Sequence, residues 1–147
     1  MKKIYPPAYL LMFIIAQTAL HYLLPLGRVI QHPYTKIGLL LTAGSLLMVF
    51  YLRYIFYHRD TTIKPFAKSD QLITNGIYRI SRNPIYIGMV VFLVGTAILF
   101  GSATPWIVIP FYPWLINRKF ILIEEEMLEK EFGEEYRKYK SRVRRWI

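Results

Sequence analysis

Residues 76–88 of this 147-residue chain read GIYRISRNPIYIG, and the end of this stretch opens an uncharged segment that continues to Ala103. Arg82 and Asn83 stand directly before Pro84. A residue before proline is biased toward an extended backbone, whereas proline itself is well tolerated in the first turn of a helix. We therefore expect an apolar helix that begins at Pro84, directly after a polar turn.

The apolar residues of the chain gather in long runs. The composition is 54% hydrophobic and 16% aromatic, and a run of about 18 or more apolar residues is long enough to cross a bilayer as a helix. Such runs predict an all-α integral membrane protein with about four transmembrane helices in two hairpins. The four predicted spans are Pro7–Leu26, Ile37–Tyr57, Ile85–Ala103 and Pro105–Ile116, the last of which can continue to Ile123.

The predicted spans leave no room for a separate soluble domain, because four of them use about 80 positions. We therefore treat 1–147 as a single membrane domain, in which 1–57 form an N-terminal helical hairpin. Basic residues cluster before the first span, between the second and third, and after the fourth. By the positive-inside rule, both chain termini are expected in the cytoplasm.

The net charge of +10 is explained by these basic flanks, which hold membrane topology and contact anionic lipid. We therefore expect no nucleic-acid partner. The chain has no cysteine, which excludes a disulfide framework and a thiolate nucleophile. The three histidines, His21, His32 and His58, are scattered between the two predicted membrane faces, so no metal site is expected.

Two features predict the packing around the last spans. Gly88 and Gly95 would let another helix or a ligand approach the third span closely. Pro110 and Pro113 should kink the fourth span, because each lacks a backbone hydrogen-bond donor. Beyond it, Glu124–Lys140 is expected to form a cytoplasmic amphipathic helix, with an apolar face made by Met127, Leu128, Phe132 and Tyr136.

Polar and aromatic side chains at the ends of the last two spans could form a ligand pocket. At a helix start, free backbone N–H groups can hold a carboxylate, and Tyr78 and Tyr86 offer flat surfaces for an aromatic base. The alternative for Arg82–Tyr86 is an ordinary interfacial edge with an anchoring arginine and tyrosine. Glu124 and Glu125 directly follow an apolar helix, where a carboxylate needs a partner.

In their order and spacing, these elements resemble the isoprenylcysteine carboxyl methyltransferase family and its phospholipid N-methyltransferase relatives. The resemblance covers about residues 60–147. The residues that carry it are Asp70–Tyr78, Arg82–Gly88, Glu124, Glu125, Leu128, Phe132, Gly133, Tyr136, Tyr139 and Arg144–Trp146.

The resemblance implies an integral membrane methyltransferase that binds S-adenosylmethionine in a cytoplasm-facing pocket and methylates a lipophilic acceptor. The half of the chain from 58 to 147 would then be the cofactor-binding, catalytic half. The resemblance assigns cofactor contacts to Asp70, Gln71, Leu72, Ile73, Tyr78, Asn83, Pro84, Ile85, Tyr86 and Glu124. For proton transfer or orientation of the acceptor, Tyr86, Glu125 and Arg118 are the candidate catalytic residues.

The chain departs from the prenylcysteine enzymes at two points. It has Arg-Asn-Pro at 82–84 where those enzymes usually have Arg-His-Pro, and Asn cannot titrate near neutral pH. The arginine expected one helical turn before Glu124 would fall on Phe120. Phospholipid N-methylation is therefore the alternative reaction, and a non-enzymatic membrane subunit that keeps this scaffold is the alternative from another class.

Overall fold

A computed structural model describes residues 5–58 and 72–147 of the chain. Within these residues the regular structure is helical, apart from one isolated bridge between Arg28 and Ser102. The longer helices are α1 (Pro6–Leu23), α2 (Thr35–His58), α3 (Pro84–Phe100), α4 (Phe111–Ile116) and α5 (Leu122–Arg142); the shorter turns are η1 (Gly76–Arg79), η2 (Thr104–Val108) and η3 (Asn117–Ile121).

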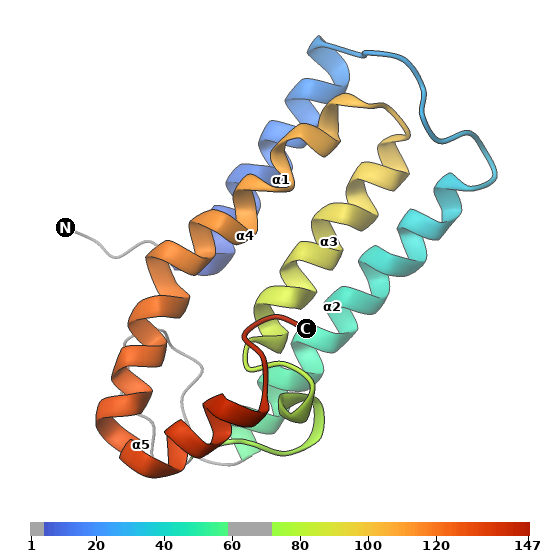
Figure 1. Ribbon diagram of the computed structural model, residues 1–147. Coiled ribbons are helices and arrows are strands. Elements are labelled where there is room, and N and C mark those ends of the chain that lie inside the picture. The colour runs from blue at the N-terminus through green and yellow to red at the C-terminus, as the bar shows by residue number, and fades with distance from the viewer. Residues whose placement is uncertain (1–4, 59–71) are drawn as a thin grey trace.

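The long helices form one bundle in which α1, α2 and α3 run in alternating directions, and α4 runs opposite to α3 and continues in the same direction into α5 (Figure 1). α2 packs mainly against α3, whereas α1 packs against η2, α3 and α4. Each of the first two helices thus makes its main contacts with the second half of the chain, and the N-terminal hairpin expected over residues 1–57 stays a prediction. The start of α3 and the whole of α5 lie at the lower end in Figure 1.

Two helical stretches of the described chain are long and apolar enough to cross a membrane, Thr35–Ile55 and Thr104–Arg142, and α3 is a shorter apolar helix. Large apolar side chains are exposed along the outer face of α2, among them Leu40, Leu47 and Phe50. Such a surface suits contact with lipid, because lipid tails are as apolar as these side chains.

Glycines bring α2 and α3 close together, as the sequence predicted for Gly95. A Cβ atom added to Gly95 would lie 2.8 Å from the backbone nitrogen of Thr42 and 2.9 Å from the carbonyl oxygen of Gly38. A Cβ atom at Gly88 would lie 3.0 Å from a methyl group of Val49. Small residues at these positions allow the two backbones to approach, which is a common way of packing helices in membranes.

The third helix begins where the sequence placed it. Pro84 is the first residue of α3, and Asn83 is its N-cap, with a φ of −127° and a ψ of 51°. The helix ends at Gly101, whose φ of +71° is readily adopted only by glycine. The carbonyl oxygen of Gly101 then accepts hydrogen bonds from the backbone N–H groups of Val29 and Ile30, which joins the two loops at that end.

The fourth apolar segment is interrupted rather than gently kinked. It starts as the 3-10 turn η2, and Pro110 is the N-cap of α4. Pro113 lies in the first turn of α4, where its missing N–H does no harm. The chain then passes through η3, a π-helical turn, and continues directly into α5.

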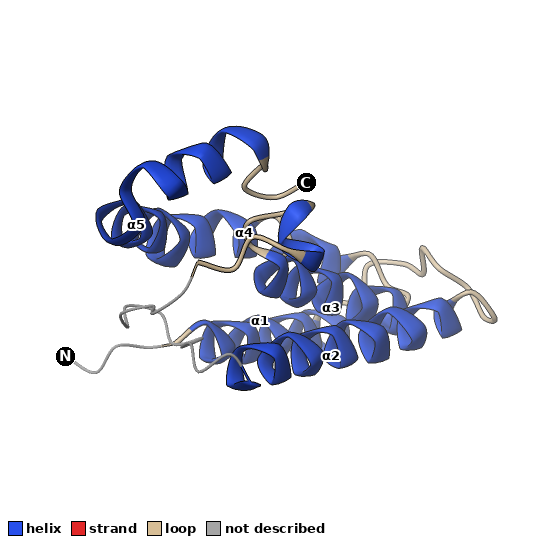
Figure 2. Ribbon diagram, turned by 90° about the horizontal axis from the view of Figure 1, so that it is seen from below, coloured by secondary structure: helices blue, strands red, loops and turns tan. Residues whose placement is uncertain are grey.

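The expected single amphipathic helix over Glu124–Lys140 is wrong at Gly133. This residue has φ 50° and ψ −120° and divides α5 into two parts. The chain reverses direction there, and the last part of α5 returns toward the bundle (Figures 1 and 2). Only glycine enters this backbone region at low cost, so Phe132 and Tyr136 do not share one continuous helix face.

A buried amide joins α1 to the third helix. Gln17 is fully buried; its Nε2 donates to the carbonyl oxygens of Leu93 (3.1 Å) and Pro105 (3.2 Å), and its Oε1 accepts from Thr96 Oγ1 (2.8 Å). Gln17→Leu would remove all three partners, and a buried polar group left without a hydrogen bond costs about 1–3 kcal/mol.

We expect Gln17→Leu to lower the melting temperature of the purified protein in detergent by several degrees. Thr18→Val is the matched control, because Thr18 bonds only the carbonyl of Ile14 in its own helix. Equal melting temperatures for wild type and Gln17→Leu would show that this amide does not hold α1 in place.

Candidate functional site

The first pair of the candidate site joins the start of α3 to the start of α5. The Tyr86 hydroxyl donates a hydrogen bond of 2.8 Å to Oε1 of Glu124, although the two residues are 38 positions apart. Tyr86 is 7% exposed and belongs to the main apolar cluster with Met89 and Phe120. The sequence placed these two residues in one pocket, and the structure brings them into direct contact.

Glu125, the neighbour of Glu124, is buried in a cluster of opposite charges. Its Oε1 lies 3.1 Å from Nη1 of Arg82, and its Oε2 lies 2.7 Å from Nη2 of Arg145. Nε of Arg145 donates to Oε1 at 2.9 Å, so this arginine binds the carboxylate through two parallel bonds. The side chains of Arg82 and Glu125 are 9% and 8% exposed. The free-energy cost of removing both ions from water is offset because each is paired with an opposite charge.

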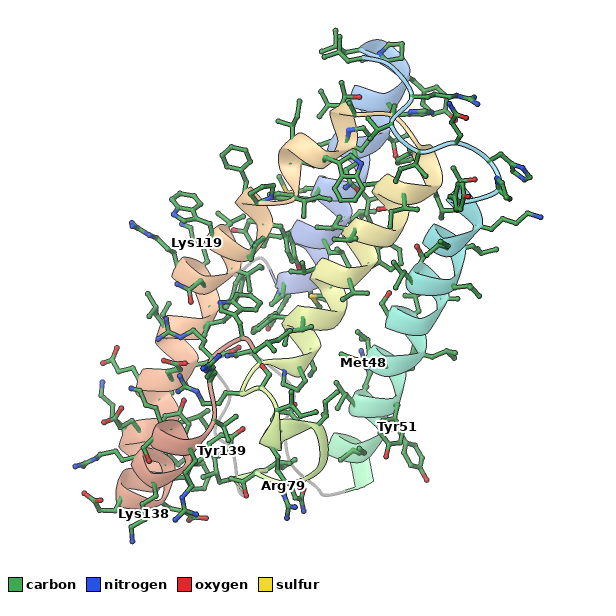
Figure 3. The ribbon with its side chains drawn as sticks, turned by 45° about the vertical axis from the view of Figure 1, so that its right-hand side comes forward. Met48, Tyr51, Arg79, Lys119, Lys138 and Tyr139 are labelled. Atoms are coloured by element: carbon green, nitrogen blue, oxygen red, sulfur yellow. The ribbon has the colours of Figure 1, made fainter. Side chains whose placement is uncertain are left out.

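Tyrosines line the side of the site next to η1. The Tyr139 hydroxyl donates 2.7 Å to the carbonyl oxygen of Tyr78, and Figure 3 shows Tyr139 pointing from α5 toward the segment that carries Arg79. Tyr78 packs with Leu52 and Ile73 in a second apolar cluster. Burial raises the pKa of the Tyr78 phenol above its ordinary value, so this hydroxyl is protonated at neutral pH.

The polar turn before α3 is fixed by hydrogen bonds. Asn83 Nδ2 donates 2.9 Å to the carbonyl oxygen of Arg145, and the Asn83 N–H donates 3.0 Å to Ser81 Oγ. Pro84 is buried and Ile85 is partly buried beside them. Of the other residues assigned to the cofactor, Leu72 is partly buried and Ile73 is buried.

Other candidate residues lie elsewhere. Asp70 and Gln71 lie outside the described residues. Arg118 is exposed, with its guanidinium carbon 5.4 Å from the centre of the Trp114 ring. Lys119 points away from the bundle in Figure 3. Phe120 is buried and makes an edge-to-face contact with Tyr9, at 5.7 Å between ring centres.

Sequence reasoning missed three residues of this site. Arg145 and Asn117 contact each other (Arg145 Nη1 to Asn117 Oδ1, 3.3 Å), and Ser81 Oγ donates 3.1 Å to the Arg145 carbonyl. The only signal for Arg145 was its place in the Arg-Arg-Trp motif near the end of the resemblance. Nothing in the sequence pairs it with Glu125, which lies 20 positions earlier.

Fold and site together define a bundle of long apolar helices that carries buried carboxylates, arginines and tyrosines at one end. Residues 34–135 match the family model described as phospholipid methyltransferase. The chain therefore belongs to the phospholipid methyltransferase family, and the family resemblance drawn from the sequence is confirmed.

Proteins of similar sequence support the same family assignment. An uncharacterized protein of Haemophilus influenzae is 35% identical over 63 residues, which are 43% of this chain and all of that protein. The protein-S-isoprenylcysteine O-methyltransferase of Saccharomyces cerevisiae is 31% identical over 108 residues, which are 68% of this chain and 45% of the yeast protein. The chain spans 26% to 45% of the isoprenylcysteine O-methyltransferases that it matches.

A solved structure shares the fold. The eukaryotic intramembrane Ras methyltransferase ICMT (isoprenylcysteine carboxyl methyltransferase) superposes with a TM-score of 0.71. The match covers 99% of this chain and 54% of that protein, at 22% sequence identity. The helical bundle described above is therefore the arrangement found in part of that enzyme.

Proposed function

We propose that this chain is an integral membrane methyltransferase that uses S-adenosylmethionine and methylates a lipophilic acceptor. The observation that carries the proposal is the contact between Tyr86 and Glu124, at the end of apolar helices in a member of a methyltransferase family. The named relatives are O-methyltransferases of isoprenylcysteine, and they support the reaction class.

The described residues fit such a cofactor. Tyr86 occupies one oxygen of Glu124, and within residues 5–55 and 72–147 no hydrogen bond uses the other oxygen. That oxygen can accept from a hydroxyl of the cofactor's ribose. Tyr78 and Tyr86 supply aromatic surface. The residues proposed to hold the cofactor are Leu72, Ile73, Tyr78, Asn83, Pro84, Ile85, Tyr86 and Glu124, together with Asp70 and Gln71 from outside the described part.

S-adenosylmethionine supplies a methyl group on a good leaving group, so the protein has mainly to bind and align the reactants and exclude water. The Tyr86 hydroxyl already donates to Glu124, and burial raises the pKa of the Tyr78 phenol further above neutral pH, so neither phenol is poised to act as a base. Glu125 is neutralised by two arginines. We therefore propose binding and positioning roles for these groups, and the role expected for Arg118 toward the acceptor stays a prediction.

The proposal includes four membrane spans formed by α1, α2, α3 and the segment from η2 to Ile123. The site then lies at the cytoplasmic face, because the basic residues of the sequence gather at the same ends of the predicted spans as the site. Lys138 and Arg142 are exposed there on the last part of α5. The N-terminus and the C-terminus would lie on the same cytoplasmic side.

The acceptor is proposed from two observations. The named relatives favour O-methylation of a carboxylate on a lipidated molecule. The family model is that of phospholipid methyltransferases, and Asn83 replaces the histidine of the prenylcysteine motif, which favours N-methylation of a phospholipid. Lipid analysis of expressing cells separates the two, because only the second produces methylated ethanolamine head groups.

Calorimetric titration of S-adenosylhomocysteine into the detergent-solubilised protein tests the cofactor site. We expect saturable binding to wild type and to Glu126→Ala, whose carboxylate is exposed and paired with Lys130, and no measurable binding to Glu124→Ala. A folded wild-type protein that binds neither S-adenosylhomocysteine nor S-adenosylmethionine would leave the non-enzymatic membrane subunit as the better description.

A further inference from the structure

The segment Val143–Ile147, here called the strap, crosses the turn that precedes α3. α5 ends at Val143, whose φ of −118° and ψ of 130° are extended. The Arg82 N–H donates 3.0 Å to the carbonyl oxygen of Arg144. One residue further, the Arg145 carbonyl oxygen accepts from both Ser81 Oγ (3.1 Å) and Asn83 Nδ2 (2.9 Å). Three consecutive residues of the turn are thus bonded to two consecutive carbonyls of the strap.

The side chain of Arg145 binds Glu125 of α5 and Asn117 of η3. Its two bonds to Glu125 are 2.9 Å and 2.7 Å long, and Nη1 also donates 3.3 Å to Asn117 Oδ1 in η3. An arginine stays charged at all physiological pH values, and the hydrogen bonds to Glu125 raise the pKa of the Arg145 guanidinium further.

We propose that Arg145 is a positioning residue for the cofactor site. Its carbonyl fixes Asn83 at the start of α3, while its guanidinium fixes Glu125 and therefore the turn of α5 that carries Glu124. This inference rests on the proposed function and extends it to a residue that, among the described residues, makes no hydrogen bond to Tyr86 or Glu124. Among the described residues, Arg82 also links the turn before α3 to Glu125, whereas Arg145 joins both of these to the segment that follows α5.

Trp146 anchors the strap to the main apolar cluster. Its side chain is partly buried against the main apolar cluster, which includes Tyr86, Met89 and Phe120. The strap is therefore held on both sides of Arg145: by the Arg144 carbonyl before it and by the indole after it. Because the residues on both sides of Arg145 are held, the backbone of Arg145 and the direction of its side chain are both fixed. A positioning role requires this.

The test uses Arg145→Gln, Arg145→Lys and the control Arg142→Gln, whose side chain is exposed at the end of α5. Hydrogen exchange of the cofactor-free protein comes first, since it does not depend on binding. We expect the Arg82 and Asn83 amides to exchange about tenfold faster or more in Arg145→Gln, with peptides of α2 unchanged. Arg142→Gln should exchange like wild type.

Binding of S-adenosylhomocysteine comes second. We expect Arg145→Gln to weaken it about 10- to 100-fold, the range that loss of a charged hydrogen bond produces. Arg145→Lys should lose less, because lysine keeps the charge but not the two-pronged bond. Glu125→Gln should weaken binding at least as much as Arg145→Gln, because it also weakens the pair with Arg82. The double variant should lose less than the sum of the two single losses, because both changes remove the bond between Arg145 and Glu125.

The outcomes separate the two proposals. If Arg145→Gln exchanges and binds like Arg142→Gln, the positioning role is overturned. If wild type binds no S-adenosylhomocysteine, the proposed function fails, while the exchange difference still decides whether Arg145 holds the turn before α3. Should Arg145→Gln not fold, Arg145→Lys and Glu125→Gln give the same comparison, and wild-type behaviour of both overturns the role.

Discussion

Gly95→Val is expected to abolish the cooperative unfolding transition of the protein in detergent. The first atom of the new side chain would lie 2.8 Å from the backbone nitrogen of Thr42 and 2.9 Å from the carbonyl oxygen of Gly38. Backbone atoms cannot move aside as the end of a flexible side chain can, so α2 and α3 would have to separate. We expect a loss of about 3 kcal/mol or more, at the upper end of what overpacking produces.

Gly44→Val is the matched control for this prediction. Gly44 also lies in α2, but a Cβ atom there would meet nothing within 4 Å. The same glycine-to-valine change should therefore leave the melting temperature within a few degrees of wild type. Thermal unfolding followed by tryptophan fluorescence compares the three proteins. Equal transitions for Gly95→Val and Gly44→Val would show that α2 and α3 do not pack as described.

Glu124→Gln is expected to have the largest effect on catalysis. The amide keeps the size of the carboxylate but loses its charge, and it weakens the hydrogen bond that Tyr86 donates at 2.8 Å. Hydrogen bonds to charged groups contribute about 1.5–3 kcal/mol. Because Glu124 bonds Tyr86 and is also proposed to bind the ribose, we expect a roughly 100-fold fall in kcat/KM for S-adenosylmethionine, measured as radioactive methyl transfer to extracted membrane lipid.

Two further variants test whether the loss of activity in Glu124→Gln arises from its contact with Tyr86. Glu126→Gln changes an exposed carboxylate two positions away, paired only with Lys130, and should retain wild-type activity. Tyr86→Phe removes the donor to Glu124, so the double variant should be little worse than Glu124→Gln alone. Additive losses in the double variant would mean that the two side chains act separately, contrary to the contact described here.

Those parts of the fold that depend on local chemistry were predictable from the sequence. The start of α3 follows from Asn83-Pro84, and the close packing of α2 on α3 follows in part from Gly88 and Gly95, because the physical cause lies in the residue itself. The position of Gly38 opposite Gly95 could not be predicted, since nothing local states which helix a glycine faces. The break at Gly133 was missed because the charges and apolar residues on either side both suit a helix.

The candidate site divides in the same way. Tyr86 and Glu124 were expected in one pocket, and their contact is observed. The pairing of Glu125 with Arg82 and Arg145 was not expected, because Arg82 lies 43 positions earlier in the chain and Arg145 reaches Glu125 only through the return of the chain after Gly133. Glu125 was predicted as a candidate catalytic residue for proton transfer. Its two arginine partners are why we propose a positioning role for it instead.

The π-helical turn η3 sets the direction in which both carboxylates face. It holds one residue more than an α-helical turn over the same rise, and it lies directly before α5. Removing one residue from Asn117–Ile121 would restore the regular phase and rotate everything before it by about 100° relative to α5. Glu124 and Glu125 would then face away from Tyr86 and Arg82. The one additional residue in the turn η3 therefore sets the angle at which the carboxylates of α5 meet the start of α3.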